Sequence, residues 1–363
     1  MFRMIWHQVF SNYGNLNFKP NDRIEKMTIK QNISGKGARV EFSNKYDHES
    51  MKVIRARIST DPEMVNASPI TLNNQDSFEI PAGQSLWSDF SKIDVPLKSS
   101  LYLELEIKNN SNHLATSAHT FSDKIFQTNV ADLDMNFVYG ITTVALLTET
   151  KGITVAFFGD SLTNQGYYTD SATQWLYDHM EGVTAINEGI SGNRLLLPGT
   201  SDSEWNNSFG QAAVERFSHL VNYRPDVVVV MIGDNDLYQV RATNMDELPT
   251  AIKAITALER IKNETIVAGI QPILVTLTPF KGAVSREVEA WSPEKELIRE
   301  EINRWIRKNE KMIDLDQYVC DRSDPRRLAE YYDSGDHLHF SEEGGTKIGA
   351  YMAEQIAELL KIE

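Results

Sequence analysis

The chain has 363 residues, of which 41% are hydrophobic and 24% are charged, and its formal net charge is -15. The length and composition are those of a globular protein with two or three domains. The acidic balance argues against nucleic acid as a partner, because phosphate groups bind to clustered Lys and Arg.

The residues before 149 alternate between apolar and polar side chains, as in strands with one buried face. Two examples are Arg39–Phe42 and Leu101–Ile107, and turn signals such as Pro81–Gly83 separate the alternating runs. Short alternating strands joined by turns are typical of an antiparallel sandwich. We predict an antiparallel, jelly-roll-like β-sandwich domain over residues 1–148.

The residues from 149 onward contain continuous apolar runs, which are typical of strands buried on both faces. The three clearest runs are Ile153–Phe158, Val227–Ile232 and Ile273–Leu277. Stretches with helical apolar periodicity lie between and after these runs. Alternation of such strands with helices predicts a parallel sheet with helices on both faces over residues 149–363.

Two helix starts are marked by capping residues in this second half. Ser292 followed by Pro293 is typical of an N-cap and first helical position, and Ser341 precedes the last apolar stripe. In a parallel sheet the ligand site lies at the carboxyl ends of the strands. Reactive side chains are therefore expected directly after the apolar runs and on late loops.

Ser161 follows the first of these runs, in the sequence Gly159-Asp160-Ser161-Leu162. A serine at the start of the following helix would be exposed, and a helix N-terminus favours developing negative charge. This makes Ser161 a candidate nucleophile. By itself such a triplet is more often a turn or a helix cap, and no Gly-x-Ser-x-Gly elbow occurs in the chain.

Asp336 and His339 form an Asp-x-x-His on the loop before the last helix. A short loop can place the carboxylate on one imidazole nitrogen and leave the other nitrogen free to accept a proton from a serine. One alternative is a metal site, because His337 and Asp333 lie beside the pair. No further ligands occur at recognisable spacing, so we expect no metal and no cofactor. The other alternative is a salt-bridged structural histidine.

Two further segments offer hydrogen-bond donors for an oxyanion. Asn235 follows the second apolar run in Gly233-Asp234-Asn235-Asp236, and Gly192 follows a short predicted strand. A side-chain amide and a backbone N–H can both stabilise a tetrahedral intermediate. Both segments could equally be ordinary turns. Asp234 would oppose charge development if it faced the oxyanion, so we expect it to point away.

Taken in order, these segments resemble the Gly-Asp-Ser-Leu (GDSL) esterase/lipase family, also called SGNH hydrolases. The matching segments are Gly159-Asp160-Ser161-Leu162, Gly192, Gly233-x-Asn235-Asp236 and Asp336-x-x-His339. The resemblance covers about residues 151–363. It implies a flavodoxin-like, three-layer SGNH hydrolase domain.

The resemblance also implies roles for the matching residues. Ser161 is the nucleophile, His339 the base and Asp336 the residue that orients the base. The backbone N–H of Ser161, together with Gly192 and Asn235, forms the oxyanion hole. The first half is similar to the β-sandwich that precedes this hydrolase in a bacterial subgroup, through the segments 39–44, 80–83 and 187–196.

On this basis we expect a serine-dependent carboxylic ester hydrolase that acts through an acyl-enzyme. The absence of an apolar lid segment in the sequence favours short acyl esters, and a small-molecule or carbohydrate ester is the expected partner. Asn193, Asp236, Trp205 and Trp291 are candidate substrate contacts, the tryptophans lying in the loops 193–211 and 285–292. Tryptophans in loops are more often packed than exposed to ligand.

Two other functions stay open from the sequence. One is a carbohydrate-binding or scaffold protein with a degenerate hydrolase domain, and the other is an acyltransferase, which shares the acyl-enzyme. The sequence has neither a signal peptide nor an apolar run of the roughly 18–20 residues that span a membrane. We therefore expect a cytoplasmic protein that binds no membrane, and the sequence leaves its oligomeric state open.

Overall fold

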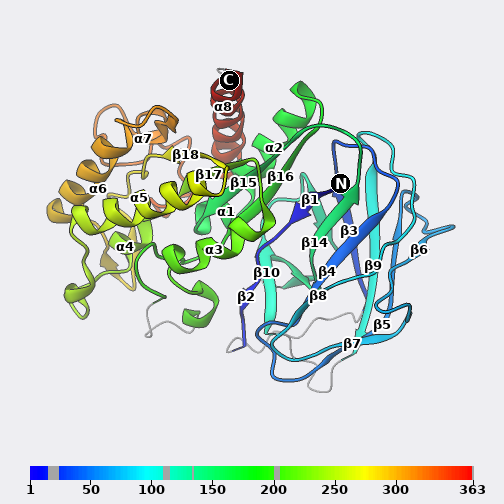
Figure 1. Cartoon of the computed structure of the whole chain (residues 1–363). Coiled ribbons are helices and arrows are strands. Elements are labelled where there is room, and N and C mark those ends of the chain that lie inside the picture. The colour runs from blue at the N-terminus through cyan, green and yellow to red at the C-terminus, as the bar shows by residue number, and fades with distance from the viewer. Residues whose placement is uncertain (15–23, 109–114, 133–134, 200–204, 362–363) are drawn as a thin grey trace.

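The computed structural model describes residues 1–14, 24–108, 115–132, 135–199 and 205–361. It contains a strand-rich half and a half in which strands and helices alternate, lying side by side (Figure 1). The strands of the first half are β1 (Phe2–His7), β2 (Ser11–Asn12), β3 (Ile24–Lys30), β4 (Ala38–Ser43), β5 (Met51–Ser59), β6 (Ser68–Pro69), β7 (Phe78–Ile80), β8 (Ser85–Trp87), β9 (Ser100–Lys108), β10 (Thr116–Thr120), β11 (Phe126–Thr128), β12 (Ala131–Asp132), β13 (Met135–Tyr139) and β14 (Ile141–Leu147).

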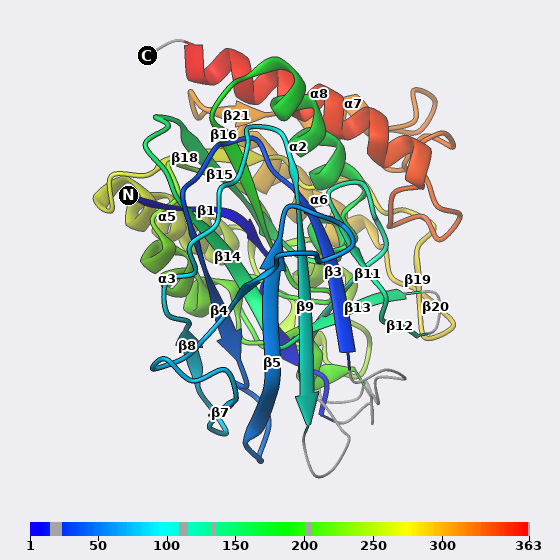
Figure 2. The ribbon, with the colours of Figure 1, turned by 90° about the vertical axis from the view of Figure 1, so that its right-hand side faces the viewer.

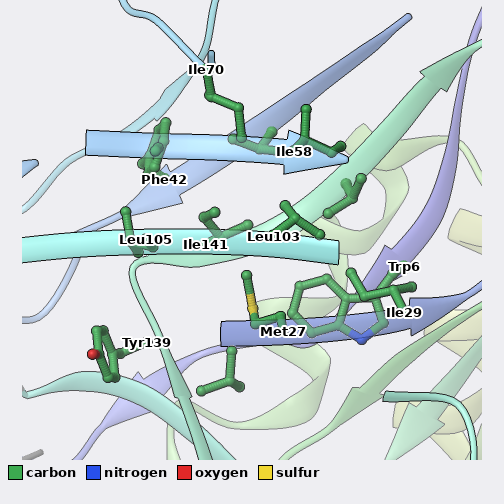
Figure 3. Packing of buried hydrophobic residues seen from close by; sticks show 14 of the residues in the cluster. Trp6, Met27, Ile29, Phe42, Ile58, Ile70, Leu103, Leu105, Tyr139 and Ile141 are labelled. Atoms are coloured by element: carbon green, nitrogen blue, oxygen red, sulfur yellow. The ribbon is translucent and has the colours of Figure 1, made fainter. Parts of the chain in front are cut away.

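The first half is the predicted antiparallel β-sandwich. Its sheets have the strand orders β1-β14-β4-β8, β12-β13-β10-β2 and β11-β3-β9-β5-β6. Figure 2 shows β3, β9 and β5 side by side on the outer face. The alternating apolar side chains of the sheets meet in one core, in which Phe42, Leu103, Leu105 and Ile141 are buried (Figure 3). The apolar side chains of the alternating pattern therefore face the core, as predicted.

The second half is an α/β fold with one parallel sheet. Its elements are β15 (Ile153–Gly159), α1 (Ser161–Asn164), α2 (Tyr167–His179), β16 (Val183–Gly189), η1 (Asn206–Phe209), α3 (Ala213–Tyr223), β17 (Val227–Met231), α4 (Asp234–Tyr238), η2 (Met245–Glu247), α5 (Ala251–Val267), β18 (Gln271–Val275), β19 (Val284–Ser285), β20 (Val288–Glu289), α6 (Pro293–Ile306), β21 (Met312–Ile313), α7 (Leu315–Val319) and α8 (Glu342–Lys361).

The parallel sheet has the strand order β16-β15-β17-β18-β21, which is the flavodoxin-like order 2-1-3-4-5. Helices α3, α5 and α6 cover one face, and α2, α7 and α8 cover the other. Both faces of the strands are buried, which explains their continuous apolar runs. The second and third runs extend one and two residues beyond the strands β17 and β18, into the loops that follow.

The helices begin where the sequence indicates. The Ser292 hydroxyl accepts a hydrogen bond from the backbone N–H of Lys295, and the Ser341 hydroxyl accepts one from Gly344. Helix α8 packs closely on α2 at Gly349, where a Cβ atom would lie 2.5 Å from the Tyr168 carbonyl oxygen. This close packing holds the loop before α8 beside the start of α1 and α2.

The two halves are joined by backbone pairing as well as by side chains. Strand β1 runs alongside β16, and the N–H of Val9 donates to the carbonyl of Asn187 (Figure 1). Strand β14 ends at Leu147 and β15 begins at Ile153, so the predicted boundary between 148 and 149 falls in the connection between them. Within the described ranges, none of the helices combines the length and apolar composition that a membrane span needs.

Candidate active site

The candidate residues gather at the carboxyl edge of the parallel sheet. Ser161 begins α1 directly after β15, Gly192 follows β16, and Asn235 lies in α4 directly after β17. The loop that carries Asp336 and His339 reaches the same edge from the start of α8. Loops after neighbouring parallel strands meet at one edge, which is why residues distant in the sequence come together here.

Ser161, His339 and Asp336 form a continuous chain of hydrogen bonds. The Nε2 atom of His339 lies 2.9 Å from the Oγ atom of Ser161. The Nδ1 atom of the same ring lies 2.6 Å from Oδ2 of Asp336. The structure thus brings the three predicted residues together, with an imidazole between a hydroxyl and a carboxylate, as in serine hydrolases.

The carboxylate of Asp336 is held in place by its own loop. Its Oδ1 atom accepts hydrogen bonds from the backbone N–H groups of His339 and Leu338 and from the hydroxyl of Ser334. Burial alone would raise its pKa, but the hydrogen bond and charge of His339 and these N–H groups outweigh burial, and the pKa lies well below its ordinary value. Asp336 is therefore ionised at neutral pH, which favours a proton on Nδ1 of His339.

A second Asp–His pair lies on the same loop and faces elsewhere. The Nδ1 atom of His337 is 2.6 Å from Oδ2 of Asp333, and the backbone of His337 adopts a positive φ of 63°. The imidazoles of His337 and His339 are thus bound to different carboxylates. Among the residues that the structure describes, no group of three or more His, Cys, Asp and Glu has a metal-binding arrangement.

Gly192 lies at a sharp turn that follows β16. Its φ is 74°, and a Cβ atom here would lie 2.2 Å from the ring of Phe209, so only glycine fits. The Gly192 carbonyl accepts a hydrogen bond from Nε2 of Gln239 at 2.7 Å. Its N–H donates to no group in the described part of the chain, so this N–H can serve a ligand.

The Asn235 side chain is fixed at both ends of its amide. Its Oδ1 atom accepts a hydrogen bond from Gln239, and its Nδ2 atom donates one hydrogen to the Asn193 carbonyl at 3.1 Å. A primary amide has two N–H hydrogens, so one remains for a further acceptor. The amide, the Gly192 N–H and the N–H of Ser161 at the start of α1 are the donors expected for an oxyanion hole.

Two carboxyl groups are buried beside the serine. Asp160 is 1% exposed and Asp234 is 3% exposed. Burial raises the pKa of Asp160 to about 6, although the N–H of Leu162 opposes this. Burial, and next the nearby Asp160, raise the pKa of Asp234 well above its ordinary value, against the charge of Arg299 and the N–H of Thr278. Thr278 lies shortly after β18 and Arg299 lies on α6, so the Asp234 carboxyl group points toward these two elements.

Comparison with known proteins assigns the chain to a family. Residues 157–346 match the model of the GDSL-like lipase/acylhydrolase family. The chain belongs to this family. The match includes Ser161, Asp336 and His339, and it begins within β15 and ends within α8. No curated protein matches the chain.

Solved structures similar to this GDSL-like lipase/acylhydrolase include three enzymes from bacteria. A psychrotrophic esterase, EstA, from Pseudoalteromonas sp. is 18% identical, with 57% of this chain and 98% of that chain covered and a TM-score of 0.41. The acetylxylan esterase Axe2 from Geobacillus stearothermophilus is 18% identical, with 57% and 94% covered and a TM-score of 0.42. A GDSL-like lipase from Bacteroides thetaiotaomicron is 18% identical, with 57% and 87% covered and a TM-score of 0.41.

Two residues expected to contact substrate support loops of this GDSL-like lipase/acylhydrolase instead. Asn193 is 0% exposed, its Nδ2 atom donates to the carbonyls of Phe209 and Gln211, and its Oδ1 atom accepts from Arg216. Its side chain therefore has no atom directed to a ligand, which corrects the expectation.

Asp236 is the other such residue. It is 2% exposed, and its two carboxylate oxygens accept the backbone N–H groups of Leu195 at 2.5 Å and of Leu196 at 2.9 Å. The residue ties the loop after β16 to the start of α4. This also corrects the expected role, because a carboxylate used in this way cannot face a substrate.

The two candidate tryptophans have packing roles as well. Trp205 packs against the core of the β-sandwich and meets the ring of Tyr13 edge-on, and residues 200–204 of its loop lie outside the described residues. The Nε1–H of Trp291 donates to Glu296, and the cations of Lys281 and Arg326 lie 5.2 and 5.6 Å from its ring centre. Both tryptophans are half-buried, and their contact with substrate stays a prediction.

His119 of the β-sandwich contacts the segment that carries the proposed oxyanion donor Gly192. The sequence did not mark this residue as functional. The Nε2 atom of His119, on β10, lies 3.3 Å from the hydroxyl of Ser191, the residue before Gly192. Its Nδ1 atom lies 2.6 Å from the hydroxyl of Tyr13, and burial lowers the pKa of His119 to about 4, so the ring is neutral. No local motif could have indicated this contact, because it joins the two halves of the chain.

Proposed function

We propose that the chain is a serine-dependent carboxylic ester hydrolase that works through an acyl-enzyme. The observation that carries the proposal is the 2.9 Å distance between Nε2 of His339 and Oγ of Ser161, combined with the 2.6 Å contact from Nδ1 to Asp336. With a proton on Nδ1, Nε2 can accept the proton of the hydroxyl. The hydroxyl oxygen is then activated for attack on a carbonyl.

The reaction proceeds in two steps that use the same residues. Ser161 attacks the acyl carbon while His339 takes its proton, and the imidazolium then protonates the leaving alcohol. Water loses a proton to the imidazole, attacks the acyl-enzyme and releases the acid. Asp336 stays ionised throughout and stabilises the imidazolium, which agrees with its lowered pKa.

The oxyanion of each tetrahedral intermediate is held by three fixed donors. We assign them to the backbone N–H groups of Ser161 and Gly192 and to the free hydrogen of the Asn235 amide. The hydrogen bonds from Gln239 hold both Gly192 and Asn235 before substrate arrives. Donors that are already in place contribute most when charge develops in the transition state.

We propose short acyl esters as the substrates, with acetylated carbohydrates as the class to test first. The sequence has no apolar lid segment, and the net charge of -15 disfavours an anionic lipid surface. A screen of acetyl release from acetylated sugars, xylan and pectin, alongside p-nitrophenyl esters of increasing chain length, tests this. Faster turnover of octanoyl than of acetyl esters would contradict a short acyl group.

The decisive experiment for the reaction itself combines labelling with substitution. A fluorophosphonate should label the wild-type chain and leave Ser161→Ala unlabelled, and Ser161→Ala should lose about 10⁴- to 10⁶-fold in the rate of p-nitrophenyl acetate hydrolysis. A scaffold or carbohydrate-binding protein with a degenerate site would not react. Product analysis with excess glycerol separates hydrolysis from acyl transfer, because a transferase would release acylglycerol.

A further inference from the structure

A cavity of about 860 Å³ lies between the β-sandwich and the α/β half, apart from the candidate active site. One wall is the face of the sheet formed by β1, β14, β4 and β8, and the opposite wall includes α3 and residues that flank β16 and β17. Ser161 and His339 do not line it. Its volume lies in the range of pockets that hold small organic ligands.

Basic side chains outnumber acidic ones in the lining of this cavity, whereas acidic side chains outnumber basic ones in the whole chain. The chain has 36 Lys and Arg against 51 Asp and Glu. The described lining instead includes more basic than acidic side chains, namely Arg3, Arg39, Lys45, Arg216 and Arg224 against Glu41, Glu188 and Asp226. An acidic protein that concentrates cations in a cavity has a site suited to an anion.

Part of this charge is already used within the protein. Arg3 pairs with Asp226 at 3.0 Å, and Arg216 donates to the carbonyl of Glu188 and lies 3.8 Å from its carboxylate. The side chain of Arg39 is different, because its guanidinium forms no hydrogen bond or ion pair with any residue that the structure describes. Its Nε atom is buried without a partner.

Aromatic rings hold the guanidinium of Arg39 in one orientation. Its central carbon lies 4.3 Å from the ring centres of both Phe2 and Trp87. A guanidinium stacked on rings has its faces covered, while its N–H bonds point outward in its plane. Such a fork matches a planar carboxylate through two parallel hydrogen bonds.

Glu41 supplies an acceptor on the same wall. It lies two residues along β4 from Arg39, so both side chains project from the same face of the sheet, about 7 Å apart along the strand. Its Oε2 atom accepts the hydroxyls of Tyr223 and Thr143, each at 2.9 Å. Its Oε1 atom accepts from no described residue, so it can take a hydroxyl from a ligand.

We propose that this cavity binds a sugar acid, that is, a hydroxylated ring that carries a carboxylate. The carboxylate binds to the guanidinium of Arg39, and a ring hydroxyl donates to Glu41. The assignment rests on a donor fork and an acceptor on one wall, which an isolated anion would not use together. It is independent of the proposed hydrolysis, because none of these groups belongs to that site.

The test is calorimetric titration of the full chain with D-glucuronate, with glucose, acetate and inorganic phosphate as comparators. Glucuronate should bind more tightly than all three, because only it offers both the carboxylate and the hydroxyls. Arg39→Gln should weaken binding roughly 10- to 100-fold, the usual effect of losing charged hydrogen bonds. Arg39→Lys keeps the charge without the fork and should also weaken binding.

Lys36→Gln is the matched control, because Lys36 is an exposed cation paired only with Asp94 in the described structure, and its loss should leave binding unchanged. Ser161→Ala should bind as the wild type does, and Arg39→Gln should keep wild-type turnover of p-nitrophenyl acetate. The proposal is overturned if glucuronate does not bind at about 10 mM. Equal binding of phosphate, or undiminished binding by both Arg39 variants, would overturn it as well.

Discussion

The two halves of this molecule place their polar groups differently on their sheets. In the α/β half the reactive side chains lie beyond the ends of β15, β16 and β17, while helices cover both faces. In the β-sandwich, Arg39 and Glu41 lie on a sheet face that is directed toward the α/β half. Groups at strand ends are carried by loops that are held by buried polar side chains such as Asn193 and Asp236. Arg39 and Glu41 line the cavity between the halves, so a substitution of either residue should affect ligand binding there and leave turnover unchanged.

The largest expected effect is on turnover, and it should distinguish the His339–Asp336 pair from the His337–Asp333 pair on the same loop. His339→Asn should lower kcat/KM for p-nitrophenyl acetate by about 10⁴-fold or more, because the base is lost. His337→Asn is the control: it removes an equivalent ring from the same loop, and Asn tolerates the positive φ of this position. It should retain activity within about threefold. Similar losses in both variants would mean that loop disruption, not loss of a base, explains the effect.

The next effect concerns the donors at the same edge. Asn235→Ala should lower kcat by about 10²- to 10³-fold with a small change in KM, because one oxyanion donor is removed. Thermal unfolding of the variant provides the check on folding. A change confined to KM would show that Asn235 binds substrate in its ground state and would remove it from the oxyanion hole.

A third prediction uses the buried carboxyl of Asp236, whose pKa burial raises to about 6 from 3.8. The folded state therefore retains a proton that the unfolded state has lost between these pH values, and stability falls as the pH rises through about 6. In Asp236→Asn this dependence disappears. The free energy of unfolding of the variant, relative to wild type, should rise by about 1 to 2 kcal/mol between pH 5 and pH 7.5. Urea unfolding at the two pH values measures it, and a constant difference would contradict the raised pKa.

The smallest effect tests whether the β-sandwich assists the active site across the contact. His119→Phe keeps a ring but loses the hydrogen bond to Ser191, and it should lower kcat about two- to fivefold with little change in KM. His119→Gln can still bond to Ser191 and should recover most of the rate. Equal rates in all three proteins would show that the contact has only a packing role.

The sequence predicted the residues that local patterns mark. Ser161, Asp336 and His339 each stand in a short motif next to a strand or helix boundary, and those boundaries follow from apolar runs and capping residues. Asn193 and Asp236 lie in the same motifs, yet they face inward. Whether a polar side chain at a strand end binds its own loop or a ligand depends on neighbouring backbone N–H groups, which no spacing reveals.

The β-sandwich illustrates a different limit. Alternation predicted its strands and their buried faces, but it could not predict that β14 pairs with both β1 and β4. The position of Trp205 against the sandwich core, and the contact from His119 to Ser191, depend on that assembly. Contacts between distant parts of the chain are set by topology, so a reading of local patterns leaves them undetermined.

The packing of β1 alongside β16 has a consequence for how the chain can be divided. Strand β16 is the outermost member of the parallel sheet. Strand β1 lies alongside it, and the segment after β1 forms a bridge from Gln8 to Asn187. A fragment starting at residue 149 would keep every group that we propose for hydrolysis, yet it would uncover the backbone N–H and C=O groups along that edge. Such edges recruit strands from other molecules, so the truncated chain should self-associate more strongly than the full chain.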